Sequence, residues 1–121
     1  MEKAYAKVMG SYAAIASENR SPINELRIFT GAPVFEYKSD AYSTVTQAKV
    51  LWDHFKLGED SKYVMTAQTY YKTATSASLG CGLKEGSNHV ILAAWEMTDT
   101  SNKVWNMLLL RDPMGNGKLY N

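Results

Sequence analysis

Two side chains in the last third of the sequence have the types and the spacing to act as a pair in acid–base chemistry. His89 opens an apolar run that ends at Met97, and Asp112 follows a second run, Val104–Arg111. The polar segment Thr98–Lys103 between the runs is rich in turn formers, which predicts a β-hairpin. A hairpin symmetric about this segment pairs residues whose numbers sum to 201, so that His89 faces Asp112. An imidazole held beside a hydrogen-bonding side chain is the orienting half of a hydrolase triad.

Four stretches of sequence, in chain order, point to one protease family. They are Glu2–Ala13, Phe29–Gly31, the segment from Gly82-Leu83 to Gly86-Ser-Asn-His89, and Leu109-Leu-Arg-Asp-Pro-Met-Gly115. These stretches resemble the calpains, where a Gly-Leu-x-x-Gly-His stretch carries the catalytic histidine and an Arg-Asn-Pro-Trp-Gly stretch carries the asparagine that orients it. The N-terminal stretch is very similar to the helix that ends the family's first protease subdomain. A papain-like protease is the near alternative, but it does not account for residues 2–13.

The resemblance implies an α+β fold, a piece of a papain-like protease core that consists of an antiparallel sheet, an N-terminal helix and one further helix. Residues 1–17 are then the helix that closes the first protease subdomain. Residues 18–22, which include Pro22, form a hinge or linker, and residues 23–121 form part of the second, His-bearing subdomain. The segment that carries the family's nucleophilic cysteine is expected to lie outside this chain.

Three positions depart from the family pattern, and they leave two hypotheses open. Asp112 replaces the orienting asparagine, Met114 replaces a tryptophan, and Asn88 replaces the glycine before the histidine. In the first hypothesis the chain is part of an intracellular thiol protease that hydrolyses peptide bonds in proteins, with His89 as base and acid and Asp112 as its orienting partner. In the second, the chain belongs to a non-catalytic homologue that serves as a protein-binding or scaffold module.

The chain is expected to contain neither a nucleophile nor a cofactor. Cys81 lies between glycines in a predicted coil rather than at a helix N-terminus, where the dipole favours a thiolate. The resemblance implies calcium for the family's complete core, but Lys118 stands where the family has an acidic residue, so no metal is expected here. The expected partners are protein substrates and the first protease subdomain of the same protein, and the chain alone is expected to be inactive.

Composition excludes several other classes of function. The 13 basic and 12 acidic residues are dispersed, which disfavours binding to nucleic acid or to anionic membranes. A hydrophobic content of 45% is sufficient for a packed core, and the apolar runs are too short to cross a bilayer. The single cysteine excludes an internal disulfide and fits a reducing, cytoplasmic compartment.

Periodicity predicts the elements that must position the pair. Apolar residues at helical spacing predict one helix over residues 3–16, and Ile23–Tyr37 is predicted to form short strands and loop. A second helix is predicted from about Ser43 to Leu57, with Ser43 or Asp40 as its N-cap and Gly58 as its end. The predicted buried stripe of this helix comprises Ala48, Leu51, Trp52 and Phe55. His54 is predicted to be a structural histidine, and Lys62–Tyr71 to be a strand.

Overall fold

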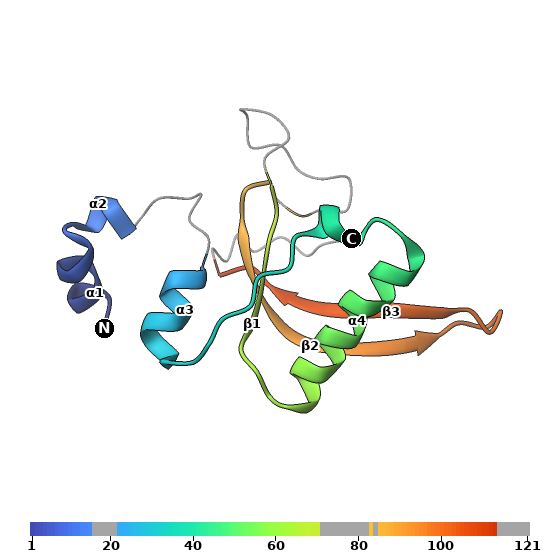
Figure 1. Cartoon of the computed structure of the whole chain (residues 1–121). Coiled ribbons are helices and arrows are strands. Elements are labelled where there is room, and N and C mark those ends of the chain that lie inside the picture. The colour runs from blue at the N-terminus through green and yellow to red at the C-terminus, as the bar shows by residue number, and fades with distance from the viewer. Residues whose placement is uncertain (16–21, 71–82, 84, 114–121) are drawn as a thin grey trace.

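The computed structural model describes residues 1–15, 22–70, 83 and 85–113. Its elements, in chain order, are α1 (Glu2–Met9), α2 (Tyr12–Ile15), α3 (Ile23–Thr30), the 3-10 helix η1 (Ser39–Tyr42), α4 (Val45–Asp60), β1 (Met65–Gln68), β2 (Asn88–Thr98) and β3 (Val104–Arg111). The strands form one antiparallel sheet in the order β1-β2-β3. Helix α4 lies against β2 (Figure 1). The predicted α+β class is confirmed.

The N-terminal segment forms two helices, so the prediction of one continuous helix over residues 3–16 is wrong. Gly10 adopts a left-handed conformation with φ of 95° and ends α1. Ser11 then begins α2, because its hydroxyl oxygen accepts a hydrogen bond from the Ala14 amide at 3.0 Å. Glycine takes the left-handed conformation without steric cost, and a serine cap satisfies an amide that a new helix leaves free.

Helix α3 occupies the start of the segment that was predicted to be short strands and loop, and that prediction is wrong. The Pro22 carbonyl accepts from the Leu26 amide at 2.9 Å, and Gly31, with φ of 67°, donates to the Arg27 carbonyl at 2.9 Å. Proline at the start and glycine just past the end are the typical boundaries of a helix. The aromatic and branched residues in this segment favoured strands and obscured those boundaries.

Helix α1 contacts α3 through one aromatic side chain. The Tyr5 hydroxyl donates to Glu25 Oε1 at 2.6 Å, and the Tyr5 ring lies 5.3 Å from the Phe29 ring. Tyr5 is therefore buried, whereas Val8 and Tyr12 are 75% and 54% exposed. The apolar side of the N-terminal helices is only partly covered by the described residues.

The predicted second helix is confirmed as α4, but its N-cap is Thr44. The Thr44 hydroxyl accepts from the Gln47 amide at 3.3 Å, and Gln47 Oε1 accepts from the Thr44 amide at 3.1 Å. This reciprocal pair is a capping box, which satisfies two backbone donors that the helix leaves free. The predicted caps, Ser43 and Asp40, both lie before the first turn and were wrong.

The capping box should contribute measurably to the stability of the chain. We expect Thr44→Ala to lower the free energy of unfolding by about 1 kcal/mol, because the Gln47 amide loses its acceptor. Ser43→Ala, one residue away, is the matched control and should change stability by less than about half of that amount. Urea unfolding followed by circular dichroism measures both, and equal effects would show that Thr44 is not the cap.

Helix α4 continues through Gly58, so the prediction that this glycine ends the helix is also wrong. The helix closes two residues later, where the Tyr63 amide donates to the Gly58 carbonyl at 2.9 Å and the Lys62 amide donates to the Glu59 carbonyl at 3.2 Å. This is the Schellman arrangement, with Lys62 in the left-handed conformation. Gly58 itself is buried, and a side chain there would overlap the sulfur of Met65. The glycine therefore allows β1 to approach the helix.

The β2–β3 hairpin is confirmed, but its register differs from the predicted one near the turn. The Asp99 amide donates to the Lys103 carbonyl and the Asn102 amide donates to the Asp99 carbonyl, each at 3.0 Å. Asn102 is left-handed, so the loop is a type I turn followed by a left-handed residue. Such a loop has an odd number of residues, and paired residues from Ala93 to Thr98 therefore sum to 202 rather than 201.

A β-bulge at Leu92 restores the predicted register toward the start of β2. Leu92 has no partner in β3, and beyond it the pairs Ile91–Leu110 and Val90–Arg111 sum to 201. The same bulge shifts the alternation of buried residues along β2, which are His89, Ile91 and Ala94.

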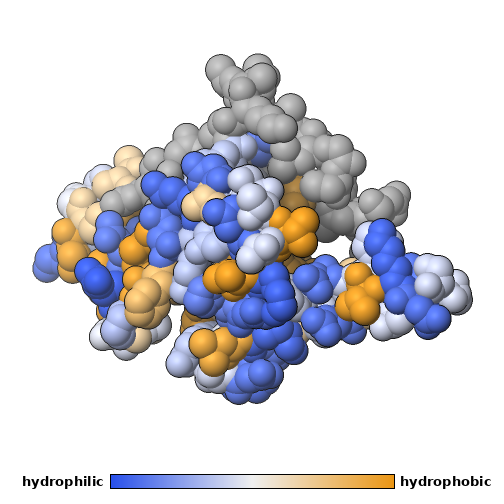
Figure 2. Space-filling view, turned by 45° about the vertical axis from the view of Figure 1, so that its right-hand side comes forward, coloured by the Kyte–Doolittle hydropathy of each residue, from blue (hydrophilic) through white to orange (hydrophobic). Residues whose placement is uncertain are grey.

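On the face of the molecule that Figure 2 shows, hydrophobic residues form separate spots among hydrophilic ones.

The turn carboxylate of Asp99 organises the tip of the hairpin. It accepts from the Ser101 hydroxyl at 2.6 Å, the Ser101 amide at 2.8 Å, the Lys103 amide at 3.0 Å and Trp105 Nε1 at 2.8 Å. The hydrogen bond from the Ser101 hydroxyl, followed by that from the Trp105 indole, holds the pKa of Asp99 well below its usual range.

These bonds predict how the tip responds to acid. A carboxyl group with a lowered pKa stabilises the fold above its unfolded-state pKa of about 3.9, and this contribution is lost as the pH falls through the lowered value. We expect the indole N–H resonance of Trp105 to stay constant from pH 7 to about 4 and to shift only at lower pH. Asp99→Asn should shift the resonance at every pH and abolish the transition. A midpoint near 3.9 in the parent chain would contradict the assignment.

Candidate functional site

His89 is the second residue of β2 and lies between the two neighbouring strands. Its partner in β1 is Ala67, and only 2% of the residue is exposed. The ring nitrogen Nε2 is buried and has no hydrogen-bond partner among the described residues. Buried polar atoms are nearly always paired in folded proteins, so an unpaired ring nitrogen calls for an explanation such as a catalytic role.

The backbone just before His89 is tied to the end of β1. The Thr69 amide donates to the Ser87 carbonyl at 3.0 Å, and the Ser87 amide donates to the Thr69 hydroxyl oxygen at 3.0 Å. The next pair along the ladder is Gln68–Asn88, and the one after it contains His89. Two backbone contacts and a strand ladder therefore position the histidine on its β1 side.

Asp112 comes directly after the last residue of β3 and is half-buried. The last pair of the ladder is Val90–Arg111, and a ladder extended by one position along both segments would put His89 opposite Asp112. No hydrogen bond joins these two side chains among the described contacts. Catalytic contacts are often long in the absence of substrate, so the register is the more informative observation.

The other candidates from the sequence have different surroundings. His54 stacks on Tyr37 with ring centroids 4.6 Å apart, which is the structural role predicted for it. Asn88 lies in the ladder beside Gln68. Cys81, Met114 and Lys118, together with most of the predicted hinge, fall outside the described residues.

One buried ionisable residue, four positions before His89 in the sequence, was missed by the sequence analysis. Glu85 is buried in the turn that precedes β2, where Gly86 adopts a left-handed conformation. The only feature of the sequence that could have pointed to Glu85 was its place in the variable part of the Gly-Leu-x-x-Gly-His stretch.

Across the described residues, no group of three or more His, Cys, Asp or Glu side chains is arranged to hold a metal ion. No described helix has the length and apolar character needed to cross a membrane.

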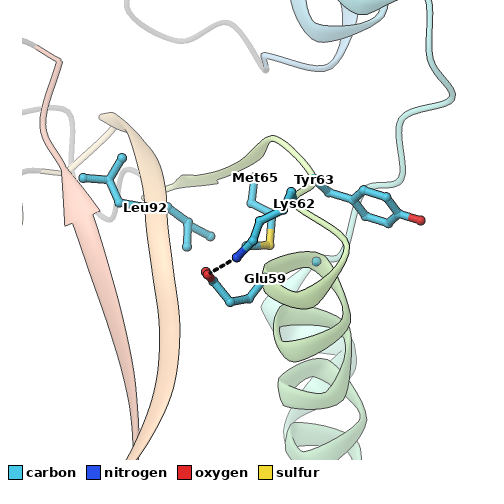
Figure 3. Close-up of a pocket in the computed structure, with 7 residues that line it drawn as sticks. Glu59, Lys62, Tyr63, Met65 and Leu92 are labelled. Atoms are coloured by element: carbon cyan, nitrogen blue, oxygen red, sulfur yellow. Dashed lines mark hydrogen bonds and ion pairs between the residues drawn. The ribbon is translucent and has the colours of Figure 1, made fainter.

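A shallow pocket of about 180 Å³ lies between the C-terminal end of α4 and strands β1 and β2 (Figure 3). Its lining residues are Gly58, Glu59, Lys62, Tyr63, Met65, Ile91 and Leu92. Lys62 and Glu59 form an ion pair at 3.1 Å beside it, and the ring of Tyr63 points away. Since neither His89 nor Asp112 lines it, this pocket is not the site of the candidate pair.

Comparison with protein families identifies the family of this chain. A family model described as calpain family cysteine protease matches residues 1–120. This chain belongs to the calpain family. A search of curated proteins finds no match to it. The match spans the N-terminal helices, α4 and the sheet, and it agrees with the family that the sequence motifs indicated.

Because the chain belongs to the calpain family, its candidate site can be compared with the parts that a cysteine protease needs. A cysteine protease needs a thiolate, a base that takes the thiol proton and a group that orients this base. Within this calpain-family chain, His89 and Asp112 are the candidates for the second and third parts.

Proposed function

We propose that this calpain-family chain supplies the histidine and its orienting residue to a cysteine endopeptidase that hydrolyses peptide bonds in proteins. The observation that supports this proposal is the register beyond the Leu92 bulge, where Val90 pairs with Arg111, so that a ladder extended by one residue would put His89 opposite Asp112. His89 would take the proton of the attacking thiol and later donate it to the leaving amine. Asp112 would accept from the imidazole N–H and hold the ring in one orientation.

An aspartate can fulfil the role that the family motif gives to an asparagine. Both side chains offer an oxygen that accepts a hydrogen bond from the imidazole. The carboxylate also carries a negative charge, which stabilises the imidazolium that forms when the thiol is deprotonated. Asp112→Asn would therefore restore the family's residue without a large change in volume.

The cysteine would come from the first protease subdomain. We propose that residues 1–17 close that subdomain, that residues 18–22 are the hinge, and that residues 23–121 belong to the second subdomain. The exposed apolar side chains of Val8 and Tyr12 support this division, because they leave a surface on the N-terminal helices for the first subdomain to cover. We propose a cytoplasmic protease and assign no calcium ligand to this chain.

One observation favours the alternative, a non-catalytic homologue that binds proteins. His89 is almost completely buried, and a general base must come within hydrogen-bond reach of the thiol that it deprotonates. In the scaffold interpretation the buried ring would only fill space in the sheet. The two functions differ in whether removal of the imidazole affects peptidase activity.

Complementation with the missing subdomain tests the proposal. The chain would be mixed with the Cys-bearing first subdomain of a calpain-family protease and assayed with a fluorogenic peptide, with and without calcium. We expect no activity from the chain alone, and activity from the mixture that falls by at least about 10³-fold in His89→Ala. Asp112→Asn should retain activity, whereas Asp112→Ala should lose most of it.

The second histidine provides the matched control. His54→Ala removes an imidazole that stacks on Tyr37, and it should leave the activity of the mixture unchanged. A mixture in which the two components bind each other without activity would favour the scaffold interpretation. Activity of the chain alone that disappears in Cys81→Ser would overturn the assignment of the nucleophile to another subdomain.

A further inference from the structure

The Leu92 bulge sets which residue the register would put opposite His89. On the side of the turn the paired residues sum to 202, and on the side of His89 they sum to 201. If the register of 202 continued without a bulge, His89 would face Pro113, and Asp112 would face Val90. A shift of one residue moves a side chain to the other face of a strand, so Asp112 would then point away from His89.

The bulge occurs where β2 loses one of its neighbours. Strand β1 pairs with β2 from Asn88 only as far as Ile91. Beyond that point the backbone groups of β2 on this edge need other partners, because unpaired buried amides and carbonyls are costly. Helix α4 supplies them at Ala94, whose amide donates to Glu59 Oε2 at 3.3 Å and whose carbonyl accepts from Lys56 Nζ at 3.4 Å.

These contacts belong to a row along one side of α4. Trp52, Lys56 and Glu59 are spaced so that they share a helix face. Trp52 Nε1 donates to Glu96 Oε1 at 3.0 Å, two residues beyond Ala94 on the same side of β2. The helix therefore continues the edge of the sheet where β1 stops, and Glu59 is the contact nearest to the bulge.

Glu59 is held in place and kept charged. The Schellman arrangement brings Lys62 back over the last turn, where its Nζ lies 3.1 Å from Glu59 Oε1 (Figure 3). The hydrogen bond from Lys62, with the charges of Lys62 and Lys56 and the amide of Ala94, keeps the pKa of Glu59 below its usual value, although partial burial opposes this. The carboxylate is thus available as an acceptor for the Ala94 amide.

We propose that Glu59 is a positioning residue that stabilises the Leu92 bulge through the Ala94 amide and so sets His89 opposite Asp112. The significance of this for catalysis rests on the proposed function, but the effect on register does not. Glu59 lies on a different element from both members of the pair, and it acts on them through the backbone of β2.

The register can be measured by NMR in the 121-residue chain. We expect cross-strand contacts in the parent for Val90–Arg111 and Ile91–Leu110 on one side of Leu92, and for Ala94–Leu108 on the other. In Glu59→Ala and Glu59→Met the first two contacts should be replaced by Val90–Asp112 and Ile91–Arg111. Glu59→Gln keeps an acceptor oxygen and should retain the parent contacts.

A matched control removes a different carboxylate from the same helix. Asp53 pairs with Lys49 at 2.9 Å on the exposed side of α4, so Asp53→Ala should leave every cross-strand contact in place. Glu59→Met preserves most of the side-chain volume, which makes it informative even if Glu59→Ala does not fold. Parent contacts at Val90–Arg111 in either variant that lacks the acceptor would overturn the proposal.

A second readout reports on the pair itself. At constant pH, Asp112→Asn should shift the ring ¹⁵N resonances of His89 in the parent and in Glu59→Gln, but not in Glu59→Met. In the complemented protease, Glu59→Met should lower kcat by about 100-fold with little change in KM, as expected for a misplaced catalytic group. Suppose that the register changes in Glu59→Met while the mixture that contains the parent chain has no peptidase activity. That combination would support the positioning role and contradict the proposed function. If Asp112→Asn shifts the His89 ring resonances in Glu59→Met as much as in the parent, the positioning role is contradicted.

Discussion

The packing of α4 against β2 is the contact on which the arrangement of this chain depends. Trp52 of the helix and Ile91 and Ala94 of the strand are among the few apolar residues that are buried in the described part of the chain. A tryptophan buries a large apolar area, and its indole N–H needs an acceptor, which Glu96 provides. Lys56 and Glu59 of the same helix reach the backbone of β2 at Ala94.

This single interface links the candidate site to elements that contain none of its residues. Gly58 allows Met65 to lie against the helix, and Met65 pairs with Ile91 at the point where the ladder of β1 ends. The bulge then follows at Leu92. The geometry around His89 is consequently a property of α4, β1 and β2 together, whereas Asp112 directly follows the last residue of β3.

The hairpin combines two local deviations that oppose each other. The three-residue turn moves the register by one residue from the symmetric expectation, and the bulge moves it back. The sequence analysis paired His89 with Asp112 from a symmetric loop that the structure does not have, and the register beyond the bulge returns to the predicted sum of 201. Asn102, whose side chain tolerates the left-handed conformation, was the available signal for the turn.

The sequence by itself determined the features that rest on local spacing. The apolar periodicity of residues 45–57 specifies α4, and two apolar runs about a polar turn specify the β2–β3 hairpin, because each pattern matches one backbone geometry. The sequence also contained local signals for the helix ends at Gly10 and Gly31 and for the N-cap at Thr44. The prediction followed other residues nearby and missed these boundaries. The tertiary structure alone decided the bulge at Leu92 and the bond from Ala94 to Glu59, which lies 35 residues away in the chain. Such contacts depend on where a strand loses its neighbour, and no periodicity within one segment encodes that position.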